Sequence, residues 1–192
     1  MEVRYLKIEY EVKPDSRHVS GYASIFNVES KDLGGFTEII DSAAFDGVLE
    51  TSDVLCFLNH NEDRGLLARS TNLQGSLMLI VDNIGLQYSF DAPHTSLGNE
   101  LLEGLKRGDI RSSSFGFIIE KEKWTRKPDG GYLRTILKFK EICDVSPVYK
   151  PAYSQTDIAL RSLSEFKEMD NKYIDELISY YADYKKQFEF LN

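Results

Sequence analysis

Apolar and polar residues alternate along much of the first 160 residues, a pattern that predicts short strands with one buried face. The first strand is expected over residues 6–12, where every second residue is apolar. Apolar runs separated by turn signals predict further strands over residues 21–26, 54–58, 66–69, 77–81 and 86–90. The run at 54–58 has no polar residue, so we expect it in the centre of a sheet.

Two stretches have helical spacing instead. The leucines of residues 96–107 fall on one stripe of an amphipathic helix, and Gly108 supplies its end. A shorter helix is expected to run to about Glu50, with Asp41 as its N-terminal cap. Both helices interrupt a chain that otherwise predicts strands.

A β-hairpin is expected in the following segment. Residues 114–124 and 132–143 predict two strands, joined by the Pro-Asp-Gly-Gly turn at 128–131. Strands therefore dominate and only two or three helices are inserted, which predicts a mainly β (α+β) fold. A closed or nearly closed β-barrel decorated with helices is the most economical architecture for this pattern.

The last thirty residues predict one amphipathic helix, set apart from a main domain of residues 1–161. Ser162 and Glu165 form a capping box at the start of the segment 162–192, and neither proline nor glycine follows. Apolar residues recur every three or four positions, at Phe166, Met169, Tyr173, Leu177, Tyr180, Tyr184, Phe188 and Leu191. Such a helix packs on the main domain or serves docking or oligomerisation, and the sequence leaves both open.

Composition excludes several classes of protein. The chain of 192 residues has a net charge of −8 and no block of lysine and arginine, which excludes nucleic acid as an expected partner. No apolar run is long enough to span a bilayer, and the N-terminus does not resemble a signal peptide. The two cysteines, Cys56 and Cys143, lie in apolar stretches and predict no disulfide. We therefore expect a cytoplasmic protein.

The candidate chemistry starts from a serine on the hairpin. If residues 114–119 form a strand, Phe115, Phe117 and Ile119 share the core face, while Ser114 and Gly116 share the opposite face. A hydroxyl beside a glycine leaves room for another chain to approach. Most serines on strands are simply solvated, so this position needs a base nearby to become a candidate nucleophile.

His60 is the candidate base among the three histidines of the chain. His18 and His94 lie in predicted loops and are expected at the surface. His60 follows the buried run, so a rigid strand holds its backbone while its ring reaches the surface, as suits a general base. Glu141 and Asp144 are candidates for the acid that orients it. They are three positions apart and would face opposite sides of a regular strand, so at most one can do so.

Several segments together resemble the phage prohead maturation proteases. The matching segments are Gly21–Asn27, Leu33–Gly35 with Glu38, Ala43–Phe45, Phe57–Asn61, Ser112–Phe117, Asp144–Val148 and Pro151–Tyr153. They cover roughly residues 8–161 in the family's order. The resemblance implies a serine endopeptidase with a fold similar to the herpesvirus assemblin proteases.

Carried over by motif, the resemblance makes Ser114 the nucleophile and His60 the general base. The acidic third member falls at Asp144, where many relatives have glutamate, and Glu141 is the alternative. Relatives also carry an aspartate where this chain has Asn61, and no role is assigned to that position. The resemblance implies no cofactor and no metal.

The resemblance also implies partners and location. The expected substrates are the capsid precursor, its scaffold segment and the protease itself, cleaved inside the assembling procapsid in the host cytoplasm. A homo-oligomer, a dimer by analogy with assemblins, is expected, with neither nucleic acid nor membrane as a partner.

Three rival functions are weighed against proteolysis. A catalytically inactive scaffolding protein could keep this fold, but serine, histidine and acid all stand at the motif positions. A metal site could use His60, Cys56 and Cys143, but both cysteines are in apolar surroundings and no Cys-x-x-Cys pair exists. An esterase would be expected to carry a Gly-x-Ser-x-Gly elbow, which the chain lacks.

Overall fold

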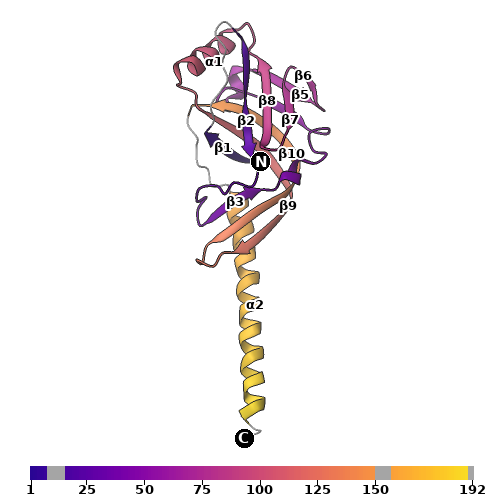
Figure 1. Ribbon diagram of the computed structural model, residues 1–192, viewed down its shortest axis with the longest axis vertical. Coiled ribbons are helices and arrows are strands. Elements are labelled where there is room, and N and C mark those ends of the chain that lie inside the picture. The colour runs from indigo at the N-terminus through magenta and orange to yellow at the C-terminus, as the bar shows by residue number, and fades with distance from the viewer. Residues whose placement is uncertain (8–15, 150–156, 190–192) are drawn as a thin grey trace. The chain divides into compact units, whose positions relative to one another are not determined.

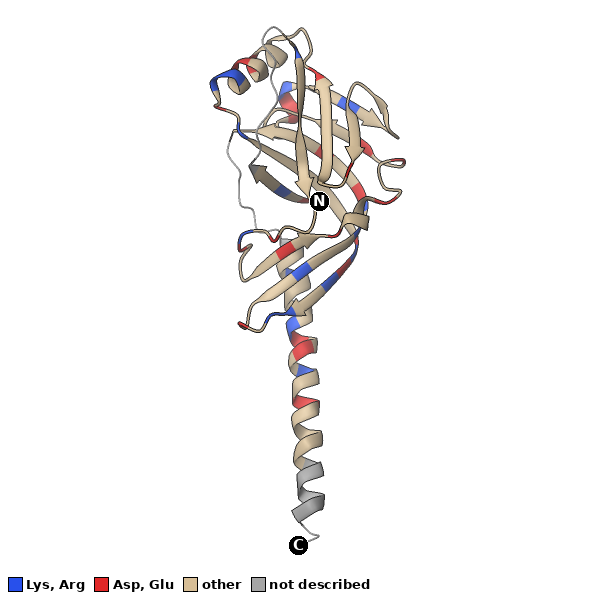
Figure 2. Ribbon diagram, in the orientation of Figure 1, with Lys and Arg blue, Asp and Glu red and all other residues tan. Residues whose placement is uncertain are grey.

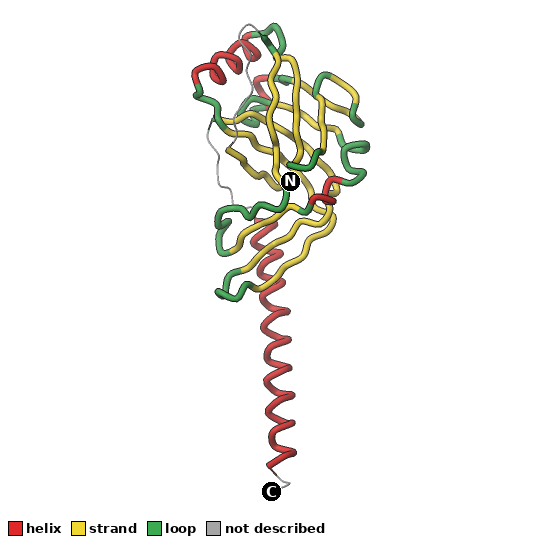
Figure 3. The backbone as a smooth tube through the Cα atoms, viewed as in Figure 1, coloured by secondary structure: helices red, strands yellow, loops and turns green. Residues whose placement is uncertain are grey.

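A computed structural model describes residues 1–7, 16–149 and 157–189 of the chain. Contacts divide the chain into two units, Met1–Ser154 and Gln155–Asn192. Strands dominate the first unit, and its helical segments are short (Figure 3). The prediction of a mainly β fold with inserted helices is therefore confirmed.

The described strands of the first unit form two sheets (Figure 1). The seven-stranded sheet contains β1 (Glu2–Lys7), β3 (Phe36–Ile40), β4 (Asp53–Cys56), β5 (Ala68–Thr71), β6 (Gln74–Gly75), β9 (Ser112–Arg126) and β10 (Tyr132–Val148). Its order is β1-β9-β10-β4-β5-β6, with β3 also beside β10. The second sheet has the order β2-β8-β7 and contains β2 (His18–Ile25), β7 (Met78–Val81) and β8 (Gly85–Asp91).

The prediction of a closed or nearly closed barrel is wrong for the described residues. β10 pairs with β9 along one edge, and its other edge is shared by β3 at residues 132–136 and by β4 at Asp144. The sheet therefore branches along the long β9–β10 hairpin. A barrel requires the end strands of a sheet to pair. Here β1 and β6 stand at opposite ends of the described strand order and do not pair.

One hydrophobic core joins the two sheets. Phe115 and Phe117 of β9 are buried in the same cluster as Tyr88 and Phe90 of β8. The hydroxyl of Ser113 donates a hydrogen bond to the Tyr88 hydroxyl at 2.9 Å, which adds a polar contact between the sheets. The expectation that Phe115 and Phe117 face the core is confirmed.

The helix α1 (Ser96–Arg107) has the predicted bounds. Its stripe of leucines is buried, and Gly108 closes it in the left-handed conformation with φ of 73°. The predicted helix from 41 to about 50 is wrong in its length. Asp41 does accept a hydrogen bond from the N–H of Ala43, but only a short 3₁₀ turn follows, because the chain turns away at Gly47 with φ of 72°.

The remaining predicted strands are all found in the structure, but their bounds differ from those predicted. The strands expected at 21–26, 54–58, 66–69, 77–81 and 86–90 correspond to β2, β4, β5, β7 and β8. The strand expected at 6–12 is β1, but residues 8–15 lie outside the described residues, as does the motif at 151–153. β3 was not predicted, although its buried positions alternate.

The second unit contains α2 (Asp157–Glu189), a single helix that carries both signs of charge (Figure 2). It begins five residues before Ser162, so the predicted capping box lies inside the helix and does not start it. Residues 157–161 include neither proline nor glycine and continue the helix. No helix in the described part of the chain is long and apolar enough to cross a membrane. A docking or oligomerisation role for this segment stays a prediction.

A buried cluster of charges ties β1 to the hairpin. The guanidinium of Arg134 is 1% exposed and contacts Glu2 through both terminal nitrogens, at 2.7 and 2.9 Å. It also contacts Glu38 and Glu122. Arg4 forms a second two-point pair with Glu38, at 2.7 and 2.8 Å. The cluster thus holds β1, β3, β9 and β10 together.

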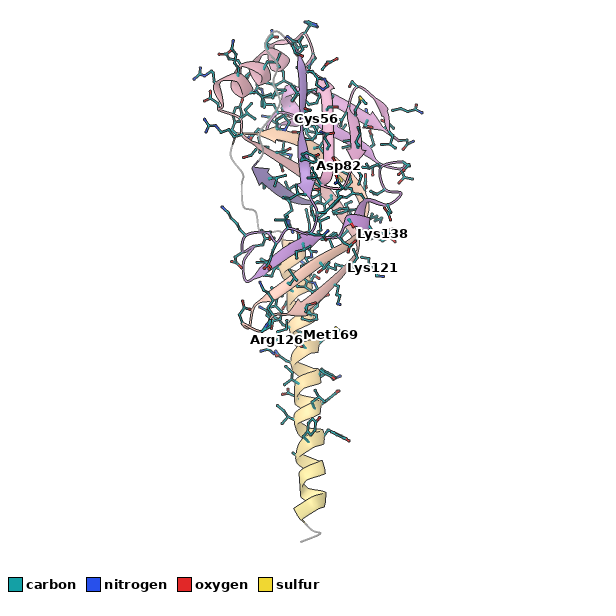
Figure 4. The ribbon with its side chains drawn as sticks, viewed as in Figure 1. Cys56, Asp82, Lys121, Arg126, Lys138 and Met169 are labelled. Atoms are coloured by element: carbon teal, nitrogen blue, oxygen red, sulfur yellow. The ribbon has the colours of Figure 1, made fainter. Side chains whose placement is uncertain are left out.

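We expect Arg134→Met to lower the free energy of unfolding by about 3–5 kcal/mol, because it leaves buried carboxylates without their cation. Urea unfolding measures this loss. Lys138→Met is the matched control on the same strand, where Lys138 (Figure 4) forms a half-exposed pair with Glu120. The control should cost less than about 1 kcal/mol. Equal losses in the two variants would contradict a stabilising role for the cluster.

The contribution of Glu2 to the free energy of unfolding should depend on pH. Burial raises the pKa of Glu2, but the hydrogen bonds and charges of Arg134 and Arg4 outweigh burial and lower the pKa below its ordinary value of 4.5. A carboxylate whose pKa is lowered on folding stabilises the folded state at pH values above 4.5. This stabilisation is lost as the pH falls through the pKa of the folded state. The difference in unfolding free energy between wild type and Glu2→Gln should therefore shrink on acidification. Glu103→Gln, at an exposed position of α1, should show no such trend.

Candidate active site

The sheet order brings three predicted site residues together. Ser114 lies on β9, Asp144 lies on β10, and His60 follows β4, and these strands are neighbours in the order β9-β10-β4. Nε2 of His60 is 2.7 Å from Oγ of Ser114. Nδ1 of His60 is 2.9 Å from Oδ1 of Asp144. The imidazole therefore bridges the hydroxyl and the carboxylate.

The carboxylate determines which nitrogen of His60 carries the proton. Oδ1 of Asp144 is buried and forms no aligned hydrogen bond with the described residues, so Nδ1 of His60, 2.9 Å away, is the donor available to it. A neutral imidazole with its proton on Nδ1 has an unprotonated Nε2. Nε2 can then accept the hydroxyl proton of Ser114, which is the arrangement that a general base requires.

The turn after β4 aims the imidazole of His60 towards β9. Asn59 and His60 have φ of 58° and 56°, in the left-handed region that few residues other than glycine adopt. The N–H of Asn59 donates to the carbonyl of Pro147 at 2.9 Å, which fastens this turn to β10. Such backbone conformations are often found at functional sites.

A β-bulge in β10 places Asp144 on the same face as Ser114. Ile142 lies opposite Phe117, which is buried in the core, and Asp144 lies opposite Gly116 on the other face. Two steps along β10 thus match one step along β9, and Cys143 is the extra residue. Without the bulge, Asp144 would share the core face with Ile142.

The same bulge changes the prediction for Glu141. It lies opposite Ile118, so it shares a face with Asp144, and the expectation that the two acids face opposite sides is wrong because the strand is irregular. Two register positions separate them, about 7 Å along the strand. Glu141 has no contact with His60 in the described residues, and the structure brings only Asp144 to the imidazole.

Ser146 supports the carboxylate and was not singled out from the sequence. Its hydroxyl donates to Oδ2 of Asp144 at 2.9 Å and accepts the N–H of Phe57 at 3.1 Å. Each carboxylate oxygen of Asp144 therefore faces one partner, Ser146 or His60. A serine two residues after the acid on one strand was the available signal, since such residues share a face.

Tyr5 also lies at this site and was missed. β1 pairs with β9 so that Tyr5 is directly opposite Ser114, and the Tyr5 ring stands edge-on to the His60 ring with centroids 6.0 Å apart. Ser114 has no exposed surface, whereas the His60 side chain is 24% exposed. The predicted open face is thus covered. Nothing in the sequence near Tyr5 indicates its partner, because more than one hundred residues separate the paired strands.

A cavity of about 540 Å³ lies beside these residues, between β1, β2 and the loop that precedes β3. Its lining is mostly apolar and includes Tyr5, Ser112 and Phe115. Ser114 itself is not in the lining. The cavity therefore reaches Tyr5 and not the hydroxyl of Ser114.

The other candidate residues take no part in the contacts of Ser114, His60 and Asp144. His18 is exposed and contacts Asp91, and His94 is exposed, as expected. Burial raises the pKa of the Cys56 thiol well above its ordinary value, and the charge of Asp144 adds to this effect. Burial also raises the pKa of Cys143. No group of three or more histidine, cysteine or acidic side chains in the described residues is placed to hold a metal ion.

Comparison with known proteins identifies the family of the chain. A family model described as caudovirus prohead serine protease matches residues 6–172, which include Ser114, His60 and Asp144. No curated protein and no solved structure gives a significant match, so the likeness to the assemblin fold stays a prediction. The matched segment covers most of the chain, and the chain belongs to the family of caudovirus prohead serine proteases.

Proposed function

We propose that this protein is a serine endopeptidase that cleaves the scaffold segment of a capsid precursor, and the protease chain itself, during procapsid maturation. Membership in the family indicates a serine protease of phage capsid maturation. The observation that carries the proposed roles is the continuous contact from Ser114 through His60 to Asp144. Ser114 is the nucleophile, His60 the general base, and Asp144 the group that orients the imidazole.

The proposed reaction begins with proton transfer from Ser114 to Nε2 of His60 as Oγ attacks the scissile carbonyl carbon. Negative charge moves to the carbonyl oxygen, where backbone N–H groups stabilise it by about 3 kcal/mol per donor. Positive charge on His60 is stabilised by Asp144, 2.9 Å from Nδ1. The imidazolium then gives its proton to the leaving amine, and an acyl-enzyme remains on Ser114.

The second half of the reaction repeats these roles with water. His60 takes a proton from the water that attacks the ester carbonyl, and returns it to Oγ of Ser114 as the ester breaks. The 24% exposure of the His60 side chain supports this step, since solvent reaches the imidazole. The enzyme is regenerated without a cofactor.

Intact-mass measurement tests the proposed activity. Wild type and Ser114→Ala are each expressed with and without the capsid precursor of the same phage. We expect fragments of the precursor, the protease or both with wild type, and none with Ser114→Ala, because alanine cannot attack the carbonyl. Ser113→Ala is the neighbouring control, because its hydroxyl contacts Tyr88 and not His60.

The control variant should cleave like wild type once circular dichroism shows that it is folded. Identical fragments in wild type and Ser114→Ala would remove Ser114 from the mechanism. An absence of cleavage by wild type in the presence of the precursor would favour a structural assembly protein.

Ser146→Ala should lower kcat about tenfold, roughly 1.4 kcal/mol of transition-state stabilisation, with KM little changed. The reason is that Asp144 loses the hydroxyl that fixes Oδ2. Ser52→Ala is a closely matched control. Ser52 is also buried, and its hydroxyl accepts the N–H of Ile142 at 3.1 Å, but it does not contact Asp144.

Both substitutions leave one buried N–H without its acceptor, so both should lower the unfolding free energy by about 1–3 kcal/mol. Only Ser146→Ala should lower kcat. Steady-state kinetics and urea unfolding of the two variants separate these effects. Equal losses of kcat would assign Ser146 a purely structural role.

A further inference from the structure

The pairing of β1 with β9 places a phenol beside the candidate nucleophile. Tyr5 and Ser114 are directly opposite in the antiparallel register, so their side chains share the face that carries His60. Cβ atoms of such cross-strand neighbours are about 4.5–5.5 Å apart. The Tyr5 ring also packs edge-on against the His60 ring, at an interplanar angle of 88°, so the phenol lies beside the histidine that contacts Ser114.

The strand register and the ring packing bring the phenol of Tyr5 close to Ser114, and the inventory of donors determines which of the two hydroxyls would donate to the other. Ser114 has one O–H donor and two lone pairs on Oγ. Its proton is committed to Nε2 of His60, at 2.7 Å. Ser114 can therefore only accept from a second hydroxyl, so in a hydrogen bond between the two side chains the phenol is the donor.

We propose that Tyr5 is a further catalytic residue, whose hydroxyl donates a hydrogen bond to Oγ of Ser114 and stabilises the negative charge that develops there as His60 takes the proton. The inference rests on the proposed function. The proton balance is simple: one proton moves from Oγ to Nε2, and Tyr5 keeps its own. The benefit is largest as the proton leaves, because a hydrogen bond to a charged acceptor is stronger than one to a neutral acceptor.

The surroundings keep the phenol in the protonated form that can donate. Burial is the largest cause that raises the pKa of Tyr5, and the negative charge of Asp144 raises the pKa further. Tyr5 therefore remains a donor at neutral pH. It is supplied by β1, which the buried pair of Glu2 and Arg134 fastens to the hairpin.

A purely covering role for Tyr5 makes a different prediction. The ring covers Ser114, which has no exposed surface, and the same residue lines the neighbouring cavity. A cover would depend on the ring and not on its hydroxyl. Tyr5→Phe would then react like wild type, and Tyr5→Ala would react faster. The donor role predicts slower reaction for both variants.

The experiment measures the rate of serine labelling by a fluorophosphonate probe and the turnover of the capsid precursor. For Tyr5→Phe we expect the labelling rate and kcat to fall about tenfold or more, with KM little changed, because a charge-stabilising donor acts in the transition state. Tyr22→Phe is the matched control. Tyr22 lies on β2 of the other sheet, and its phenol donates a hydrogen bond of 2.6 Å to Asp82; the variant loses this bond and should react like wild type.

A second substitution keeps the test independent of folding. Replacing Tyr5 by 3-fluorotyrosine preserves the ring and the donor, and should retain at least the wild-type labelling rate. Labelling of Ser114→Ala gives the background. If wild type reacts and Tyr5→Phe reacts equally fast, this inference alone is overturned. If 3-fluorotyrosine loses as much rate as Tyr5→Phe, the donor role is likewise wrong. Wild type that reacts no faster than Ser114→Ala overturns the proposed function as well.

Discussion

The contacts of the candidate active site depend on the register between β9 and β10. Ser114 lies on one of these strands, and Asp144 and Ser146 lie on the other. The turn that carries His60 is held to β10 through the N–H of Asn59. Side chains of a strand alternate between its faces, so a slip of one residue would turn the serine or the carboxylate into the core. The distances around the imidazole are therefore consequences of strand pairing more than of the loop that carries the histidine.

The core on the opposite face of the same strands maintains this register. Phe115 faces Val145 and Phe117 faces Ile142, and all four side chains are buried. Burying each such side chain contributes about 1.5–3 kcal/mol, whereas a typical hydrogen bond contributes about 1 kcal/mol. Packing therefore decides the register, and the polar contacts fit within it. The bulge at Cys143 reconciles the two faces, because it lets Ile142 reach the core while the next paired residue points outward.

Local patterns predicted what depends on neighbours in sequence. The bounds of α1, the capping role of Asp41 and the position of Ser114 on the face opposite Phe115 all follow from short-range signals. Register and closure could not be predicted in this way. The bulge has no marker residue, so the two acids were placed on opposite faces. The pairing that brings Tyr5 to Ser114 joins segments more than one hundred residues apart. The barrel was wrong for the same reason, because alternation indicates strands but does not indicate which strand edges meet.

The carboxylate of the site must be paired because little water reaches it. The side chain of Asp144 is 6% exposed, and a buried carboxylate is costly unless hydrogen bonds compensate its lost hydration. Ser146 donates one hydrogen bond to the carboxylate, and Nδ1 of His60 lies 2.9 Å from its other oxygen. With a neutral imidazole the compensation is incomplete, since a neutral donor faces a full negative charge. Transfer of the Ser114 proton to His60 turns this contact into an ion pair in a poorly solvated setting. The same burial that makes the carboxylate costly in the resting state thus favours the charge distribution that the proposed attack creates.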